Sequence, residues 1–254
     1  MINGAGGKIL FFSRVFLYIF SLHSGFETFT AQEVTNMDNS ASEHYPLPVF
    51  VNVAGRRCLV VGGGTIAERK IRDLLESGAN VTVVAEKPSP DVERLHEEGA
   101  ITLEKHRFKP VDVEGAMIVF AATDDPQVNS LVSEESIKRG ILVNAVDNPS
   151  LCTFYSGAVI KRGPLRVAVS TSGLSPKIAA ELRRELEQTI PESYGEYVRS
   201  VGEWRRWIID MDDIPEQKKR LAIERLTEKA TFAAFRELGK EKTWEKLRKT
   251  IFSS

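Results

Sequence analysis

Apolar positions between residues 57 and 147 fall into short runs separated by longer mixed stretches. Five runs are rich in β-branched residues, and three are nearly continuous in apolar residues, as expected of strands buried on both faces. The runs are residues 57–61, 81–86, 101–106, 116–123 and 141–147. Helical stretches separate most of them, at residues 65–77, 89–98 and 126–139. This alternation predicts a doubly wound parallel sheet with right-handed crossovers.

The pattern changes after residue 152. Residues 157–160 and 165–170 are predicted to be two strands of a hairpin, with its turn at Arg162, Gly163 and Pro164. A helix over residues 175–190 is expected next, with Ser175 as its N-cap. Aromatic and aliphatic residues then recur among mixed charges, which predicts a small helical domain at residues 191–254.

Residues 1–44 differ from the rest of the chain. Residues 9–22 are apolar, but Arg14 interrupts them, and they are shorter than the roughly 20 residues of a membrane span. Lys8 before them fits the start of an export signal, whereas the polar stretch that follows fits a disordered extension. Both interpretations stay open, and neither makes this segment part of the folded domain.

Composition limits the classes of partner. The 254 residues include 34 basic and 35 acidic side chains, a formal charge of −1, so no overall field favours nucleic acid or an acidic membrane. Cys58 and Cys152 are too few for a disulfide framework, which indicates structural thiols in a reducing compartment such as the cytoplasm. The four histidines are scattered, so no resident metal is expected.

A glycine turn follows the first predicted strand. Gly62, Gly64 and Ala67 form G-x-G-x-x-A at the start of the first crossover helix. A dinucleotide pyrophosphate binds at such a place, on the amides of a helix N-terminus. Strand, turn and helix in this order favour a Rossmann-like dinucleotide site, and the alternative is a purely structural turn.

An acidic residue is expected about 20 positions further on, at the end of the second strand. Glu86 stands there, where its carboxylate can accept hydrogen bonds from the adenosine ribose. A carboxylate disfavours a 2′-phosphate, so the pattern predicts NAD rather than NADP, although the adjacent Lys87 opposes this preference.

Polar residues end the fourth and fifth predicted strands, at the edge of the sheet where ligands bind. These segments are residues 121–125 and 144–149. Asp147 follows an apolar strand between Asn144 and Asn148. It is either a partly desolvated general base or, because Asp before Asn-Pro forms turns, a local turn former.

Basic residues gather in the hairpin and the following helix. They are Lys161, Arg162, Arg166, Lys177, Arg183 and Arg184. This group can bind a polycarboxylate, or it can be a solvated surface balanced by Glu181, Glu185 and Glu187.

Four ordered motifs resemble a known family. They are "YPLPVFVNVAGRRCLVVGGGTIAERK", "AATDD", "VNAVDNP" and "LRVAVSTSGLSP". Over residues 45 to about 210 the chain resembles the precorrin-2 dehydrogenase / sirohydrochlorin ferrochelatase family of siroheme biosynthesis. Members oxidise precorrin-2 to sirohydrochlorin with NAD, and some also insert ferrous iron to make siroheme.

The resemblance implies a role for particular residues. It implies NAD contacts at Gly62, Gly64, Thr65, Ile66, Glu86 and Lys87, with Thr123 and Asp124 near the nicotinamide. It makes Asp147 the catalytic carboxylate. Arg166, Thr171 and Lys177 are then expected to bind the tetrapyrrole; some members carry a serine and two glycines where this chain has Thr171, Ser172 and Gly173.

The resemblance also implies an organisation for the chain. It gives an NAD-binding domain at residues 45–152, a dimerisation region at residues 153–190 and a homodimer, because the family is dimeric. Ferrous iron would be a substrate rather than a bound cofactor. The open alternatives are a member that only dehydrogenates and, in another class, an NAD-binding redox sensor without tetrapyrrole chemistry.

Overall fold

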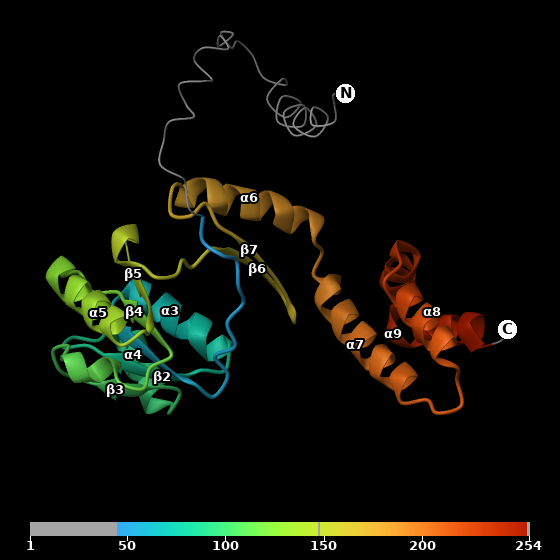
Figure 1. Ribbon diagram of the computed structural model, residues 1–254, viewed down its shortest axis with the longest axis horizontal. Helices are drawn as coiled ribbons and strands as arrows, with labels where there is room; N and C mark the ends of the chain where they lie inside the picture. The colour runs from blue at the N-terminus through green and yellow to red at the C-terminus, as the bar shows by residue number, and fades with distance from the viewer. Residues whose placement is uncertain (1–44, 147, 253–254) are drawn as a thin grey trace, which may run out of the picture. The chain divides into compact units, whose positions relative to one another are not determined.

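The computed structural model describes residues 45–146 and 148–252 (Figure 1). The predicted leader at residues 1–44 and the candidate base Asp147 therefore lie outside the described residues. Among the described residues, no helix is both long enough and apolar enough to cross a membrane.

The larger sheet has five parallel strands in the order β3-β2-β1-β4-β5. The strands are β1 (Arg57–Val61), β2 (Asn80–Val84), β3 (Thr102–Glu104), β4 (Ile118–Ala121) and β5 (Leu142–Ala145). The chain order reverses between β1 and β4, so the crevice at their carboxyl ends is the expected ligand site of such a sheet. The predicted Rossmann-like fold is confirmed.

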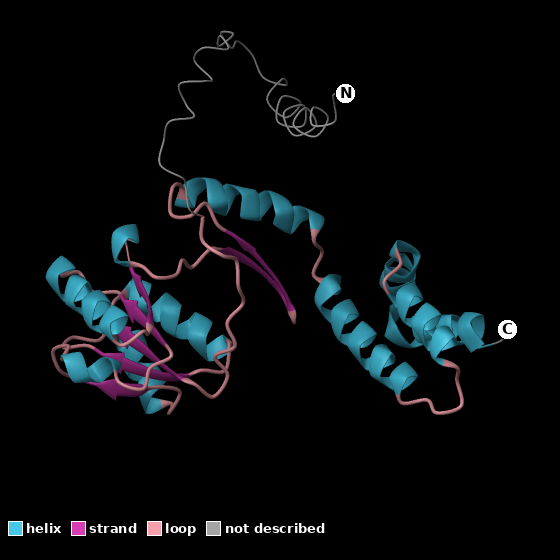
Figure 2. Cartoon of the chain, in the orientation of Figure 1, coloured by secondary structure: helices cyan, strands magenta, loops and turns pink. Residues whose placement is uncertain are grey.

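Side chains of β1 alternate between two cores, one on each face of the sheet. Cys58 and Val60 pack with helices α3 (Thr65–Glu76) and α4 (Pro90–Glu97), while Leu59 and Val61 lie in the opposite core. That second core also contains residues of α5 (Pro126–Lys138) and of the short helix η2 (Pro110–Val113). Helices on both faces explain why the strands are almost continuously apolar (Figure 2).

Most strands end earlier than their apolar runs predict. The run 116–123 contains β4 at Ile118–Ala121, and the run 101–106 contains only Thr102–Glu104. The amide of His106 donates to the carbonyl of Glu104, which turns the chain out of the sheet. Local bonds of this kind are set by the loop and are not visible in hydrophobic periodicity.

The second sheet is the predicted hairpin, with β6 (Ala158–Arg162) and β7 (Leu165–Val169) antiparallel. Arg162 pairs with Leu165, so Arg162 belongs to the strand and the predicted three-residue turn is wrong: only Gly163 and Pro164 form the loop. Two-residue hairpin loops need a positive φ, and Gly163 supplies it at 55°. After the hairpin, Ser175 caps α6 (Pro176–Thr189) by accepting from the amide of Ile178.

Three further helices follow, α7 (Ser193–Ile209), α8 (Glu216–Leu226) and α9 (Lys229–Phe252). They share a separate core of buried residues, which are Tyr197, Trp204, Ile208, Ala222, Leu226 and Phe235. Within it Trp204 stacks on Trp244, with ring centroids 5.3 Å apart. Gly239 adopts a φ of 79° and interrupts α9.

Candidate functional site

The glycine turn is held between the loops that follow β2 and β4. A Cβ atom on Gly62 would lie 2.2 Å from the carbonyl oxygen of Ala122, and Gly62 has a φ of 120°. A Cβ on Gly63 would lie 2.7 Å from the Cα of Pro88. Both positions therefore need glycine because neighbouring backbone approaches too closely for a side chain. The role of Gly63 was not among the sequence predictions.

Gly64 is different, because a Cβ there would meet nothing within 4 Å. Gly64 is the N-cap of α3, and no side chain caps that helix. Open space in front of uncapped helix amides is what a pyrophosphate requires. Thr65 and Ile66, the next two residues, are both exposed beside this space. The residues present thus fit a dinucleotide at the predicted place.

Glu86 and Lys87 follow β2 and lie beside the turn. The amide of Ser89 donates to the carbonyl of Gly63, and a Cβ on Gly63 would approach the carbonyl of Lys87 at 3.4 Å. Glu86 is half exposed and forms an ion pair with Arg107, whose Nε lies 2.6 Å from Oε1 of Glu86. Arg107 lies just beyond the third predicted strand and was not among the residues predicted for the site.

The segment after β4 is fixed by a buried amide. Asn129, on α5, accepts from the amide and the hydroxyl of Thr123 and donates to the carbonyl of Thr123. Asp125 caps α5 by accepting from the amide of Gln127. Asp124, between them, is exposed. These bonds hold Thr123 and Asp124 at the carboxyl end of β4, next to Gly62, and Asn129 is a further residue that the sequence did not single out.

Residues on both sides of Asp147 are described, although Asp147 is not. The amide of Val146 donates to the carbonyl of Ala121, and Asn148 caps the short helix η3 (Pro149–Leu151) by accepting from the amide of Ser150. Asn144, on β5, donates to the carbonyl of Phe154. The segment after β5 therefore begins beside the end of β4.

The loop before α6 packs against that same segment. A Cβ on Gly173 would lie 3.4 Å from side-chain atoms of Pro149 and Tyr155. Within the loop, the hydroxyl of Thr171 donates to the carbonyl of Ser175 and accepts from the amide of Ser175. The loop that carries Thr171 thus lies beside the residues that follow Asp147, and its hydroxyl is already part of the loop structure.

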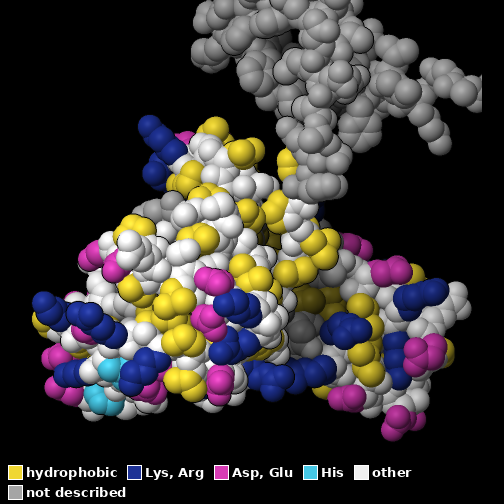
Figure 3. Space-filling model, turned by 60° about the vertical axis from the view of Figure 1, so that its left-hand side comes forward, with side chains coloured by type: hydrophobic (Ala, Val, Ile, Leu, Met, Phe, Trp, Pro, Cys, Tyr) yellow, Lys and Arg dark blue, Asp and Glu magenta, His cyan; other side chains and the backbone are white. Residues whose placement is uncertain are grey.

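Five of the six clustered basic residues form ion pairs with nearby carboxylates. Lys161 contacts Asp73 and Glu76 of α3, and Arg166 contacts Glu76 at 2.7 Å. Arg162, Arg183 and Arg184 pair with glutamates on α6 or directly after it. On the face in Figure 3, basic and acidic side chains are likewise interspersed. Lys177 is exposed and has no ion-pair partner among the described residues.

Two titratable side chains, Cys58 and Lys70, are buried near the candidate site. Burial raises the pKa of the Cys58 thiol and lowers that of the Lys70 ammonium. Lys70 lies over the ring of Phe120, 5.1 Å from its centroid, and Phe120 contacts Phe154 edge to face. Burial likewise raises the pKa of Cys152, whose thiol donates to the carbonyl of Ala145. Neither thiol is activated as a nucleophile.

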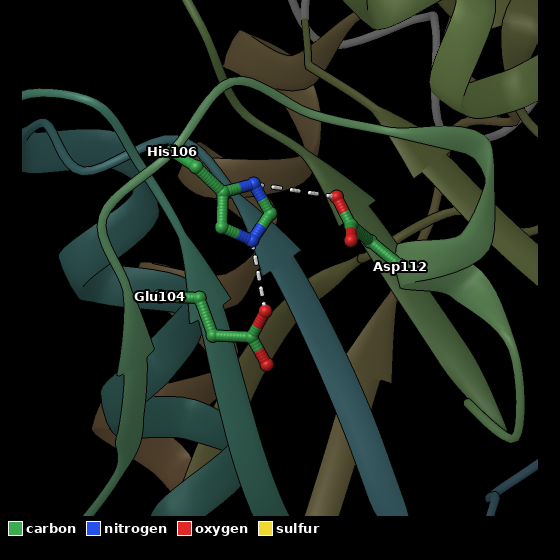
Figure 4. Close-up of side chains that lie close together, drawn as sticks. All are labelled: Glu104, His106 and Asp112. Atoms are coloured by element: carbon green, nitrogen blue, oxygen red, sulfur yellow. Dashed lines mark hydrogen bonds and ion pairs between the residues drawn. The ribbon is translucent and has the colours of Figure 1, made fainter.

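Glu104 at the end of β3, His106 after it and Asp112 on η2 lie together, with possible ligand atoms within 4.8 Å of one another (Figure 4). Nδ1 of His106 is 2.8 Å from the carbonyl of Arg107, and Nε2 is 2.9 Å from the carboxylate of Glu104. Both partners accept hydrogen bonds, so both ring nitrogens donate and neither offers a lone pair to a metal. The hydrogen bonds to Arg107 and Glu104 raise the pKa of His106.

Two hollows of the described surface lie elsewhere. One, of about 570 Å³, lies among the C-terminal helices between Trp207 and Arg248. The other, of about 600 Å³, lies where β1 begins, between Arg57 and Glu114, and thus at the opposite end of the strands from the glycine turn. Neither hollow is lined by the glycine turn or by the residues that follow β2 and β4.

Comparisons with known proteins find an NAD(P)-binding region that contains the glycine turn. Residues 49–158 match a family model described as putative NAD(P)-binding, and residues 162–189 match one described as sirohaem biosynthesis protein central. A siroheme synthase of Methylobacillus flagellatus is 42% identical over 173 residues, which are 68% of this chain and 37% of that protein. One of Nitrosococcus oceani is 39% identical over 63% of this chain and 34% of that protein. The chain thus spans about a third of these relatives' length.

A solved structure of similar length also matches. It is SirC, a precorrin-2 dehydrogenase, with a TM-score of 0.68 and 27% identity over 80% of this chain and all of that chain. The two family models, the sequence relatives and this fold agree with the family that the sequence motifs resemble. The chain therefore belongs to the precorrin-2 dehydrogenase / sirohydrochlorin ferrochelatase family, of the type found in siroheme synthases.

Proposed function

We propose that this protein oxidises precorrin-2 to sirohydrochlorin with NAD, as a step of siroheme biosynthesis. The observation that carries the proposal is the glycine turn, whose open Gly64 and uncapped helix lie at the switch point of the sheet. The match to SirC over its whole length supports the same substrate.

The chain's own residues supply binding and orientation. The amides at the start of α3 hold the pyrophosphate, Glu86 and Lys87 lie at the adenosine ribose, and Thr123 and Asp124 lie toward the nicotinamide. When bound, NAD supplies the acceptor for the hydride that leaves the tetrapyrrole. Gly62 and Asn129 keep the two loops in place, and these loops would hold the dinucleotide at the carboxyl ends of the strands.

A base must take the proton that accompanies the hydride, and we assign Asp147 to this role. The neighbouring residues support it, because Val146 is bonded to the end of β4 and Pro149 packs on the loop before α6. Precorrin-2 carries several carboxylates, and Lys177 is the exposed cation nearest to that loop in sequence. Arg166 and Thr171 complete the proposed substrate contacts, although both also bond within the chain.

The printed name of the relatives, siroheme synthase, supports a second proposed activity, insertion of ferrous iron into sirohydrochlorin. Iron is then a substrate, and removal of the pyrrole protons calls on a base in the same crevice. The alternative within the family is a dehydrogenase that leaves iron insertion to another enzyme.

We also propose the organisation expected from the sequence, with an NAD-binding domain at residues 45–152, a dimerisation region at residues 153–190 and a helical domain from residue 191. Leu174, just before the N-cap of α6, and Ile178 and Leu182, one helical turn apart on α6, are exposed by 84%, 61% and 43%. An apolar stripe of this kind marks a surface that another chain covers, here in a homodimer. The buried Cys58 and the partly buried Cys152, both unreactive, are consistent with a cytoplasmic location.

One experiment tests the function. Purified full-length protein is mixed with precorrin-2 and NAD, and the absorbance of the tetrapyrrole is followed together with the formation of NADH. We expect one NADH for each sirohydrochlorin, and a further spectral change when ferrous ion is added. Tight NAD binding without oxidation of the tetrapyrrole would favour the redox-sensor alternative, and oxidation without the second change would leave a dehydrogenase alone.

A further inference from the structure

Arg107 lies next to the carboxylate proposed to bind the adenosine ribose. Its Nε is 2.6 Å from Oε1 of Glu86, and the side chain of Arg107 is 87% exposed. The two terminal nitrogens of this guanidinium have no hydrogen-bond partner among the described residues. The terminal N–H groups of the Arg107 guanidinium therefore face solvent beside the position proposed for the ribose.

The backbone that carries Arg107 is held firmly. His106 donates from Nδ1 to the carbonyl of Arg107. From Nε2 it donates to the carboxylate of Glu104 (Figure 4). Two residues further, the amide of Lys109 donates to the buried carboxylate of Asp112 at 2.7 Å. These bonds fix the start of the Arg107 side chain, while its exposure leaves the guanidinium able to turn.

The charges at this position differ from those of a site that rejects NADP. A lone carboxylate repels a 2′-phosphate and accepts from the ribose hydroxyl, whereas a nearby arginine accommodates the phosphate. Here the carboxylate of Glu86 is paired with Arg107, and Lys87 adds a second cation. The repulsion that Glu86 would exert is therefore offset by two positive charges.

We propose that Arg107 sets the cofactor preference of this enzyme, by exchanging Glu86 for the 2′-phosphate of NADP so that the site accepts NADP as well as NAD. A planar guanidinium binds a phosphate through two parallel hydrogen bonds, which a lysine cannot reproduce. With NAD, Arg107 stays on Glu86 and only orients the carboxylate. The inference rests on the proposed function, because it needs a dinucleotide at the glycine turn.

The test measures dissociation constants of NAD and NADP for the full-length protein by calorimetry. Wild type is expected to bind NADP within about tenfold of NAD. Arg107→Ala is expected to weaken NADP binding about tenfold and to change NAD binding less than about threefold, because one charge-assisted contact is lost for NADP alone. Arg107→Lys should restore only part of the loss, and added salt should weaken NADP binding more in wild type than in Arg107→Ala.

Lys105→Ala is the matched control, since Lys105 belongs to the same exposed loop but pairs with Glu93 of α4. It removes the same charge and should leave the ratio of the two dissociation constants unchanged. Equal loss of both cofactors in Arg107→Ala, or an unchanged ratio, overturns the role of Arg107 while the proposed function stands. If neither dinucleotide binds the folded wild-type protein, the proposed function and this inference fall together.

Discussion

Gly62 and Ala122 meet backbone to backbone, so closely that a Cβ atom on Gly62 would lie 2.2 Å from the carbonyl oxygen of Ala122. Gly64, two residues later, has open space around the same position and an ordinary φ of −86°. The two glycines of the motif therefore serve different purposes. Gly62 permits two strand ends to approach, and Gly64 leaves room for a ligand.

This difference gives the first prediction. Gly64→Asp should abolish NAD binding, because a carboxylate stands where the pyrophosphate must lie. The fold should survive and gain up to about 0.5 kcal/mol in the free energy of unfolding, because Asp is a favoured N-cap. Gly62→Ala, in contrast, should cost at least about 2 kcal/mol through its strained φ and the clash. Calorimetric NAD titration and urea denaturation measure the two effects; unchanged NAD affinity in folded Gly64→Asp would exclude the turn from the site.

Asp147→Asn tests the proposed base. Asn keeps the size and hydrogen-bonding capacity of Asp but cannot take a proton, so NAD should bind normally while the turnover rate falls by roughly 10²- to 10⁴-fold. Asn also forms turns as readily as Asp, so a residue that only shapes the turn would tolerate this change. Near-normal turnover of the folded variant would return Asp147 to that structural role. Loss of iron insertion in the same variant would mean that both reactions use this carboxylate.

Replacing Arg166 and Lys177 together by Ala should raise the KM for the tetrapyrrole more than the KM for NAD, and added salt should enlarge the effect. Lys177→Ala alone should account for most of it, because Arg166 is already paired with Glu76. Steady-state kinetics of the double variant and of Lys177→Ala, with Glu76→Gln as a control for loss of that ion pair, make the comparison. Equal changes in both KM values would indicate a structural role instead.

His106 predicts a dependence of stability on pH. Its hydrogen bonds, first to the carbonyl of Arg107 and then to Glu104, raise the pKa of the imidazole in the folded protein. The folded chain thus holds the proton more tightly than the unfolded chain. The stabilisation is fully present below about pH 6.5, the usual histidine pKa, and is lost as the pH rises through the raised value. Urea denaturation gives the free energy of unfolding of wild type and of His106→Gln between about pH 5.5 and about pH 8.5. The difference between the two should fall as the pH rises. A difference that does not vary with pH would contradict it.

Tyr197 makes a corresponding prediction at alkaline pH. Its hydroxyl donates to the carbonyl of Leu226, and burial raises the pKa of this phenol from 10.0 to about 12. Because the folded state keeps the neutral form, the contribution of Tyr197 is complete below pH 10 and is lost as the pH rises toward 12. Tyr197→Phe should cost about 1 kcal/mol at neutral pH and show a smaller alkaline decline. Denaturation of both proteins across this pH range gives their free energies of unfolding. Parallel curves of this free energy against pH would show that Tyr197 does not titrate.

Much of the fold could be predicted because it depends on local patterns. The run 57–61 and the glycines after it determine β1, the turn and the start of α3, and all three are confirmed. The loops were harder, since the bond from His106 to Glu104 ends β3 early and places Arg107 beside Glu86. The hydrophobic pattern of a sequence does not reveal a local hydrogen bond of this kind.

The candidate site shows the same limit. Six clustered cations suggested an anion site, yet Lys161 and Arg166 find their partners in α3, more than 80 positions away in the sequence. Such pairs depend on how the hairpin packs, which composition does not reveal. Asn129 was missed for a related reason. A single buried amide on a helix can be recognised as holding a loop only when the structure shows Thr123 hydrogen-bonded to it.

The position of β1 in the sheet affects how the protein must fold. β1 is made before its partners, and its Cys58 pairs with Val81 on one side and with Ile118 on the other. During synthesis β1 can acquire β2 early, but its second edge stays unpaired until β4 has been added. Contacts so distant in the chain close slowly, and an exposed apolar strand edge invites pairing between molecules. A fragment ending between β3 and β4 is therefore expected to aggregate, whereas one that extends past β5 closes the sheet and stays in solution.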